Sequence, residues 1–308
     1  MFKRANVAGF LQGLFVLPLC ALFGGLVGLL FHAREFGLWA CVGFCALFPI
    51  FGALKTRQSA LLAGLLVGVI VSISLLIALV PAHAQSPPLP LCGFVVCLDP
   101  GHVSETSAGT VSRDGKLTEA HVNWVIAQRL THLLETEGAK VVPTKHRESQ
   151  VVANRLRAQI ANDAHADLFL RLHCDSGEQS GIATYYPDRQ GRHFGVTGPS
   201  LVVIEASRRT AQIFHPAAAA ALRGALPDAG IKGDSQTGVG GKQGALTGSI
   251  FSQVPALTVE MCVLTNAHDY RFIKAAAGQE AMAHALLAGV EAVAVQKKDH
   301  PIQEKDKR

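Results

Sequence analysis

One stretch of the chain decides the fold: VVCLDPGH, residues Val95–His102. Its first four residues are apolar, as in a short buried strand, and the Pro-Gly pair that follows indicates a tight turn. The turn presents a histidine. In α/β sheets, ligands bind beyond the carboxyl ends of the strands. A histidine at that point therefore predicts a functional site at this edge of the sheet.

Three more reactive side chains occupy comparable positions. His173 ends the apolar run LFLRLH, Glu260 lies near the end of PALTVE, and Glu119 opens the helical pattern that follows the His102 loop. Two histidines and one carboxylate match the ligands of a catalytic zinc site, and a further glutamate can act as its general base. His102, His173 and Glu119 also have structural alternatives as turn, buried or helix-capping residues. A purely structural role is harder to assign to Glu260, because a carboxylate within an apolar strand is costly to bury unpaired.

Strand and helix patterns alternate after residue 93, which predicts an α/β fold with a mixed, mostly parallel sheet flanked by helices on both faces. A Gly-rich stretch is expected to form a loop, and the charged C-terminal tail, 296–308, is expected to be disordered. The predicted strands are 94–98, 139–144, 167–172, 181–186 and 256–262; the helices are 119–137, 150–164, 200–226 and 270–295; the loop is 230–248.

The first 84 residues form a predicted membrane region with apolar runs at 7–31, 37–54 and 59–82. About 20 apolar residues span a bilayer as a helix, so the second run, with Pro49 inside it, is the least certain of three spans. Basic residues precede the first run and separate the second from the third. This pattern places the N-terminus inside and everything after residue 85 outside the cytoplasm. A linker, 85–93, then leads to a catalytic domain, 94–295.

A second interpretation uses the same residues. Ala82, His83 and Ala84 resemble the cleavage site of a signal peptide, which would release the domain after Ala84. The apolar core is longer than usual for a signal peptide, which favours an uncleaved anchor. In both cases we expect the domain on the periplasmic side. The uncleaved anchor also implies the inner membrane as the location and the lipid bilayer as a partner.

Charge and cysteine content narrow the classes of function. Residues 1–84 hold five basic residues and one acidic residue, which leaves 23 basic and 22 acidic residues for the remainder. This balance gives no support to a nucleic-acid surface. The seven cysteines include no C-x-x-C pair, which excludes a zinc ribbon or thioredoxin motif. The four outside the membrane region are interpreted as small buried thiols, with a periplasmic disulfide as the alternative.

Over residues 94 to about 290 the chain resembles the zinc-dependent N-acetylmuramoyl-L-alanine amidases of the family 3 type. The resemblance implies that His102, Glu119 and His173 bind one Zn²⁺ and that Glu260 is the catalytic glutamate. It also implies the substrate: the amide bond between the lactyl group of N-acetylmuramic acid and L-alanine in peptidoglycan. The motifs that carry it are LDPGH (98–102), LTE (117–119), Arg147, Arg157 with AN (161–162), ADL (166–168), PALTVE (255–260) and LTN (264–266).

Two motifs depart from the family pattern. Members commonly carry more glycines after the first histidine, where this chain has VSET, residues 103–106. The third motif usually reads SIHAN, and here it is RLHCD, residues 171–175. Neither change removes a ligand. Arg171 and Asp175 are expected to alter the rim of the site. The resemblance therefore predicts the type of reaction more firmly than it predicts which peptidoglycan is preferred.

Four residues have weaker assignments. Asp99 either orients His102 or stabilises the turn before Pro100. Arg147 and Arg157 either contact acidic groups of the substrate or form structural ion pairs. Asn266 is expected to cap the last helix.

Several alternatives stay open. The domain could be another zinc peptidase acting on cell-wall peptides, or an inactive wall-binding regulator. A transporter is disfavoured because the apolar runs carry no ionisable residue at mid-membrane depth. An unidentified activator remains an open partner. The sequence does not decide whether 185–205 or 230–248 covers the site.

Overall fold

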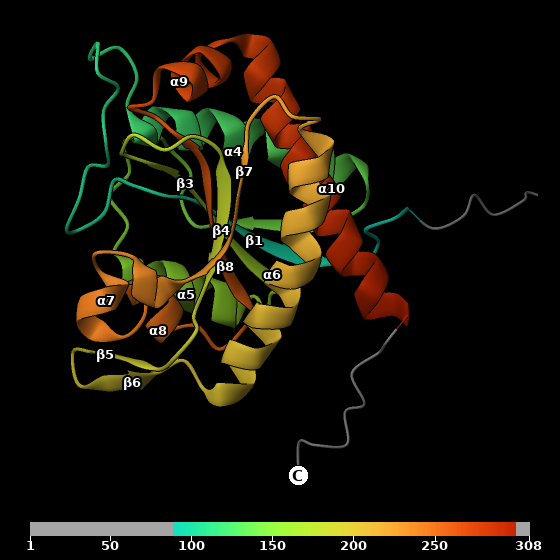
Figure 1. Cartoon of the computed structure of the whole chain (residues 1–308). Helices are drawn as coiled ribbons and strands as arrows, with labels where there is room; N and C mark the ends of the chain where they lie inside the picture. Colours follow the sequence, from blue (N-terminus) through green and yellow to red (C-terminus); the bar gives the residue numbers. More distant parts are fainter. Residues whose placement is uncertain (1–88, 300–308) are drawn as a thin grey trace, which may run out of the picture. The chain divides into compact units, whose positions relative to one another are not determined.

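The computed structural model describes residues 89–299, which form a central sheet with helices packed against it (Figure 1). The strands are β1 (Val95–Pro100), β2 (Lys140–Pro143), β3 (Leu168–Asp175), β4 (Ile182–Tyr186), β5 (Gly191–His193), β6 (Val196–Gly198), β7 (Asp228–Gly233) and β8 (Ala256–Val263). The helices are α4 (Glu119–Thr136), α5 (Asn154–Asp163), α6 (Leu201–Ala221), α7 (Gly240–Gln243), α8 (Thr247–Ile250), α9 (Ala267–Lys274) and α10 (Ala276–Asp299), with a 3₁₀ turn at Asp234–Gln236.

The main sheet has six strands in the order β2-β1-β3-β8-β4-β7. Strands β2, β1, β3 and β8 run parallel to one another, β4 is antiparallel to β8, and β7 is parallel to β4. The prediction of a mixed, mostly parallel sheet is therefore confirmed. Because β1, β3 and β8 are adjacent and parallel, their carboxyl ends meet at one edge, where His102, His173 and Glu260 were expected to lie together.

Helices cover both faces of the sheet, as predicted. On one face α4, α6 and α10 bury their apolar stripes against alternate strand residues such as Leu98, Leu170 and Leu257. On the other face α5 packs Ala158 and Ala161 against the remaining strand residues, among them Phe169. The alternation of buried residues along each strand explains why both faces are apolar at the centre of the sheet.

Five parts of the predicted outline differ from the structure. The 200–226 helix ends at Ala221, and part of the expected Gly-rich loop forms strand β7 and the short helices α7 and α8. The hairpin β5–β6 was not predicted. The last helix is divided into α9 and α10 at Ala275, whose backbone is extended (φ −79°, ψ 137°). Helix α10 continues to Asp299, so the tail is not disordered from Gln296 onward.

The predicted membrane spans and the possible cleavage site after Ala84 lie outside the described residues. Within residues 89–299, no helix is long and apolar enough to cross a bilayer. The folded part begins before Phe94, because Leu91 is completely buried in the core and its N–H donates to the carbonyl of Glu137 (2.9 Å).

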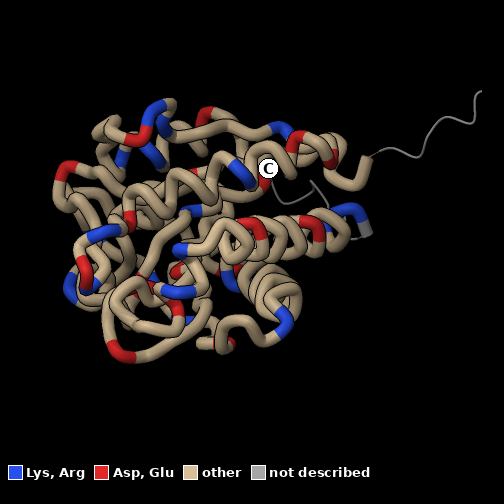
Figure 2. Tube along the Cα trace, turned by 90° about the horizontal axis from the view of Figure 1, so that it is seen from above, with Lys and Arg blue, Asp and Glu red and all other residues tan. Residues whose placement is uncertain are grey.

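The charged residues of the described part are interspersed. In the view of Figure 2, segments of Lys and Arg and segments of Asp and Glu are distributed over the whole trace. This arrangement agrees with the near balance of charges after residue 84.

A buried ion network joins β1, β3 and α5. Asp99 is fully buried and accepts from Arg157 Nη1 (2.5 Å), Arg171 Nε (3.0 Å) and Thr144 Oγ1 (2.5 Å). Burial alone would raise the pKa of Asp99, but the guanidinium groups of Arg157 and Arg171 outweigh it and hold the pKa well below its usual range. Asp99 therefore remains charged in the interior.

We expect Asp99→Asn to lower the free energy of unfolding by about 3–5 kcal/mol, because it leaves two buried guanidinium groups without their counter-charge. Urea unfolding monitored by circular dichroism at pH 7 measures this change. Since the folded-state pKa of Asp99 is depressed, the stabilisation is present above about pH 4 and is lost as the pH falls toward the folded pKa. Gln159→Ala, at an exposed position on the same helix as Arg157, is the control. A loss below about 1 kcal/mol in Asp99→Asn would contradict the prediction.

Candidate metal and catalytic site

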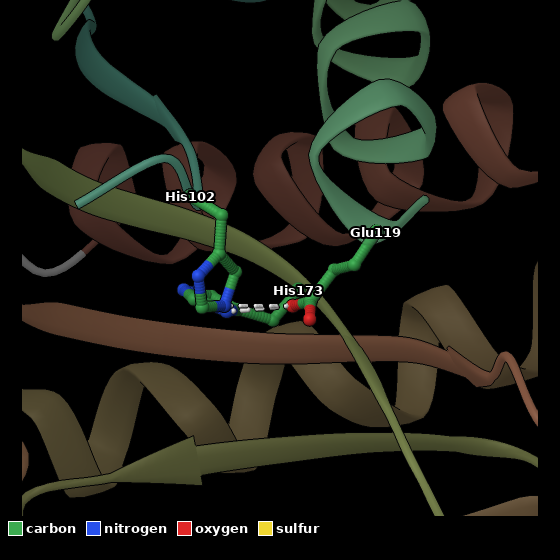
Figure 3. A group of neighbouring side chains, drawn as sticks. All are labelled: His102, Glu119 and His173. Carbon is green, nitrogen blue, oxygen red and sulfur yellow. Dashed lines mark hydrogen bonds and ion pairs between the residues drawn. The ribbon is translucent and has the colours of Figure 1, made fainter. Parts of the chain in front are cut away.

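Three predicted ligands converge at the carboxyl edge of the sheet: His102, Glu119 and His173 (Figure 3). One ligand atom from each lies within 4.8 Å of the others. Glu119 Oε1 is 3.2 Å from His102 Nε2 and 3.0 Å from His173 Nδ1. The two imidazole rings stand edge to face, with centroids 4.9 Å apart. Two nitrogens and one carboxylate oxygen thus point to a single position.

The backbone around His102 is fixed by buried cations. His102 has a positive φ of 55°, a conformation that is uncommon for a residue with a side chain. Lys145 Nζ donates to the His102 carbonyl (2.5 Å), and Arg157 donates to the carbonyls of Pro100 (3.0 Å) and Val103 (2.8 Å). These bonds hold the turn on both sides of the histidine.

The His102 ring has a partner of its own. Its Nδ1 lies 3.3 Å from the carbonyl oxygen of Ser107, which leaves Nε2 facing Glu119. A carbonyl that binds the second ring nitrogen is the usual way to orient a metal-ligating histidine. The VSET segment also has a structural role, since Glu105 Oε2 accepts from the N–H of Asn154 (3.0 Å) at the start of α5. Ala153, the N-cap residue of that helix, has no side chain that could do this.

Glu119 is placed by the start of helix α4. Thr118 caps this helix, with its side chain accepting from the N–H of His121. The carboxylate is buried and accepts from the N–H groups of Thr110 (2.8 Å) and Cys174 (3.1 Å). Burial would raise the pKa of Glu119, but hydrogen bonds with His102 and His173 outweigh it and keep the pKa low. The carboxylate is therefore charged, as metal binding requires.

His173 lies in β3 beside the turn at Gly101. A Cβ built on Gly101 would come within 2.4 Å of the His173 ring, so only glycine allows this close approach. Burial lowers the pKa of His173, which favours the neutral imidazole that binds metals. Its Nε2 is buried and has no hydrogen-bond partner. The donor set, its charge states and its convergence all fit a zinc ion.

Glu260 lies next to this group on β8, directly opposite His173 in the strand register. Its Oε2 is buried without a hydrogen-bond partner. Burial raises the pKa of Glu260 well above its usual range, and the carboxylates of Glu119 and Asp175 raise it further. A carboxyl group with a raised pKa beside a metal site suits proton transfer.

The weaker candidates are dispersed. Asp99 does not bond to the His102 ring but pairs with Arg157, so this arginine forms a structural ion pair. Arg147 is exposed and has no ion-pair partner among residues 89–299. Asp175 is exposed at the end of β3. Asn266 caps the short helix α9 instead of the long last helix, accepting from the N–H groups of the second and third residues of α9.

Sequence reasoning missed or misplaced several residues. Lys145, which holds the His102 carbonyl, gave no motif signal. Arg171 was expected at the rim but is buried against Asp99, and its Nη2 donates to Asn154 Oδ1 (2.9 Å). His215, which the sequence analysis did not single out, is buried between Thr184 and Asp228. Of the four cysteines expected to be buried, Cys92 is exposed.

We expect Gly101→Ala to weaken zinc binding by about tenfold or more, because the new methyl group must displace the His173 ring. Equilibrium dialysis with zinc, followed by metal analysis, measures the affinity. Gly238→Ala is the matched control, since a Cβ there meets nothing within 4 Å. Glu119→Gln and His173→Ala should lose zinc altogether. Unchanged zinc affinity in Gly101→Ala would show that the His173 ring does not need to pack against Gly101 in order to bind zinc.

Comparison with known proteins identifies similar sequences. The chain is 29% identical over 203 residues to the N-acetylmuramoyl-L-alanine amidase LytC of Bacillus subtilis, covering 65% of this chain and 35% of LytC. It is 26% identical over 220 residues to the N-acetylmuramoyl-L-alanine amidase AmiC of Escherichia coli O6:H1, covering 65% of this chain and 52% of AmiC. The chain thus spans about a third to a half of these two relatives.

Solved structures show the same fold. The amidase Ami1 of Mycobacterium smegmatis superposes with a TM-score of 0.56 at 19% identity, covering 67% of this chain and 99% of that structure. An N-acetylmuramoyl-L-alanine amidase of Clostridium difficile 630 gives 0.53 at 22% identity, with 67% and 97% covered. The family model described as N-acetylmuramoyl-L-alanine amidase (Amidase_3) matches residues 96–292, so the chain belongs to this amidase family.

Proposed function

We propose that the protein is a zinc-dependent N-acetylmuramoyl-L-alanine amidase that acts on peptidoglycan. The observation that carries the proposal is the placement of Glu260 directly opposite His173, beside the three convergent ligand atoms. Family membership supports the same reaction. The ligands His102, Glu119 and His173 leave room for a fourth position, as in other catalytic zinc sites with three protein ligands.

Bound zinc would lower the pKa of a water molecule and polarise the scissile carbonyl. The remaining steps belong to Glu260. Its carboxylate takes a proton from the attacking water, and the oxygen forms a bond to the amide carbon between the lactyl group and L-alanine. Glu260 then gives the proton to the departing nitrogen as the C–N bond breaks. The second proton of the water passes from the new carboxyl group to the released amine. The products are a lactyl carboxylate and an ammonium group on the stem peptide, so atoms and charge balance.

Several protein groups prepare the site for this reaction. The backbone N–H groups of Thr110 and Cys174 fix the Glu119 carboxylate, and the Ser107 carbonyl fixes the His102 ring. These contacts orient the ligands before zinc binds, and ligand orientation of this kind commonly changes metal affinity by 10- to 100-fold.

We expect Glu260→Gln to lower hydrolysis by at least about 100-fold while zinc still binds, because the amide cannot take the proton from water. The full chain is incubated with purified peptidoglycan, with and without a chelator, and the products are identified by mass spectrometry. Wild type should release intact stem peptides in a chelator-sensitive reaction. Release of single amino acids would indicate a peptidase, and near-normal hydrolysis by Glu260→Gln would remove the proposed role.

We further propose that the catalytic domain faces the cell wall and is tethered to the inner membrane by the apolar N-terminal region. Support comes from the apolar runs before residue 85 and from a substrate that lies outside the cytoplasm. An activator of the enzyme, left open by the sequence, is not part of this proposal.

The exposed thiol of Cys92 offers a test of this location. A membrane-impermeant maleimide applied to spheroplasts should label Cys92, because the three other cysteines of the described part are buried. Cys92→Ser should remove the labelling that the described domain contributes, which is read as the difference from wild type. Labelling that requires lysis of the spheroplasts would place the domain in the cytoplasm.

A further inference from the structure

A row of polar residues crosses five strands of the sheet. Cross-strand pairing places Asp99 of β1 beside Arg171 of β3, Arg171 beside Thr258 of β8, Thr258 beside Tyr185 of β4, and Tyr185 beside Lys232 of β7. Cross-strand partners share one face of a sheet, so all five side chains lie on the same face. This is the face that α5 covers at its apolar part.

The next row along the strands contains the catalytic glutamate. Glu260 is paired with His173 of β3 on one side and with Ala183 of β4 on the other. Along β8, Glu260 is two residues from Thr258, and along β4, Ala183 is two residues from Tyr185. A spacing of two residues keeps side chains on the same face. The Tyr185–Lys232 end of the polar row therefore extends from Glu260 on the side opposite the metal ligand His173.

The two ends of the row differ in how their polar groups are satisfied. Asp99 and Arg171 are paired with each other at one end. At the other end, Thr258 is only 3% exposed and its Oγ1 has no hydrogen-bond partner. Lys232 forms no ion pair within residues 89–299, and its Nζ lies 5.6 Å from the centre of the Tyr185 ring. Buried polar groups without partners are rare unless a ligand or water completes them.

The charges around this end make a cation necessary for an anionic ligand. The carboxylates of Glu260, Asp175 and Asp234 all lie close enough to Tyr185 to raise its pKa, after the larger effect of burial, to about 12. These carboxylates would repel an anionic group that approached Tyr185 unless an unpaired cation such as Lys232 were close to it. Arg171 cannot take this role, because Asp99 and Asn154 occupy its guanidinium group.

We propose that Lys232 binds a carboxylate of the stem peptide and is a specificity determinant of the enzyme, with Thr258 and Tyr185 lining the same subsite. This inference rests on the proposed amidase function. The chemistry of the substrate favours the peptide over the glycan: the sugars next to the scissile bond offer hydroxyl and acetamido groups, whereas the peptide beyond L-alanine carries carboxylates. A lysine without an ion pair complements only the peptide half.

A rival explanation is that Lys232 merely balances the charge of Glu260. The two explanations predict different substrate dependence. If Lys232 only balances Glu260, its loss lowers the rate on every substrate by the same factor. If it binds a substrate carboxylate, its loss lowers the rate only on substrates that carry that carboxylate.

The test compares native peptidoglycan with peptidoglycan whose carboxylates have been converted to carboxamides by carbodiimide coupling with ammonia. Initial rates of stem-peptide release are measured at low substrate concentration for the full chain as wild type, Lys232→Gln, Lys232→Arg and Lys242→Gln. Lys242 is an exposed residue of α7 and serves as the matched control. Circular dichroism and zinc content verify that each variant is folded and loaded.

Wild type should prefer the native substrate by about tenfold or more, the usual contribution of a charge-assisted hydrogen bond. Lys232→Gln should lose about tenfold or more on native substrate and little on amidated substrate. Lys232→Arg should keep part of the preference, and Lys242→Gln should match wild type. A wild type that cuts both substrates equally overturns the inference without any variant, as does an equal fall on both in Lys232→Gln. Failure of wild type to release stem peptides from native peptidoglycan overturns the proposed function instead.

Discussion

The structure depends on one buried carboxylate and the two guanidinium groups that neutralise it. Asp99 is completely inaccessible, and an isolated charge in that environment would be strongly unfavourable. Arg157 reaches it from helix α5 and Arg171 from strand β3, so a single negative charge joins one helix and two strands. Any other placement of β1, β3 and α5 would separate these charges and leave them buried without a partner. The ion pairs therefore favour one relative position of the helix and the two strands.

The same network determines where the metal ligands lie. Arg157 binds Asp99 and, with its other nitrogens, the carbonyls of Pro100 and Val103 on either side of His102. Lys145 binds the carbonyl of His102 itself. The turn that contains this positive φ is thus held by hydrogen bonds from Arg157 and Lys145, and Asp99 neutralises the charge of Arg157. The position of the metal ligand His102 at the carboxyl edge of the sheet therefore depends on the buried ion pairs of Asp99, so the fold fixes this ligand before metal binds.

The sequence was sufficient for the parts of the fold that repeat a local pattern. Strand β1 and the ligands at strand ends could be predicted because apolar runs and parallel order bring their carboxyl ends together. Strand β7 could not, because Gly-rich residues acquire strand structure only by pairing with β4. Likewise, the break at Ala275 between α9 and α10 lies inside a continuous helical pattern. The burial of Arg171 was missed because its partner, Asp99, is 72 residues away along the chain.

Arg171 also shows how a large side chain in the third motif depends on a small residue elsewhere in the chain. The usual serine of the third motif is small, whereas the Arg171 guanidinium fills the space between β3 and α8. A Cβ built on Gly248 in that helix would lie 2.8 Å from the guanidinium, so this backbone can approach only as glycine. The large side chain on the strand and the absent side chain on the helix are therefore complementary. Arg171 is also the register partner of Thr258. The packing of Arg171 against α8 therefore lies on the same sheet face as Glu260 and Lys232.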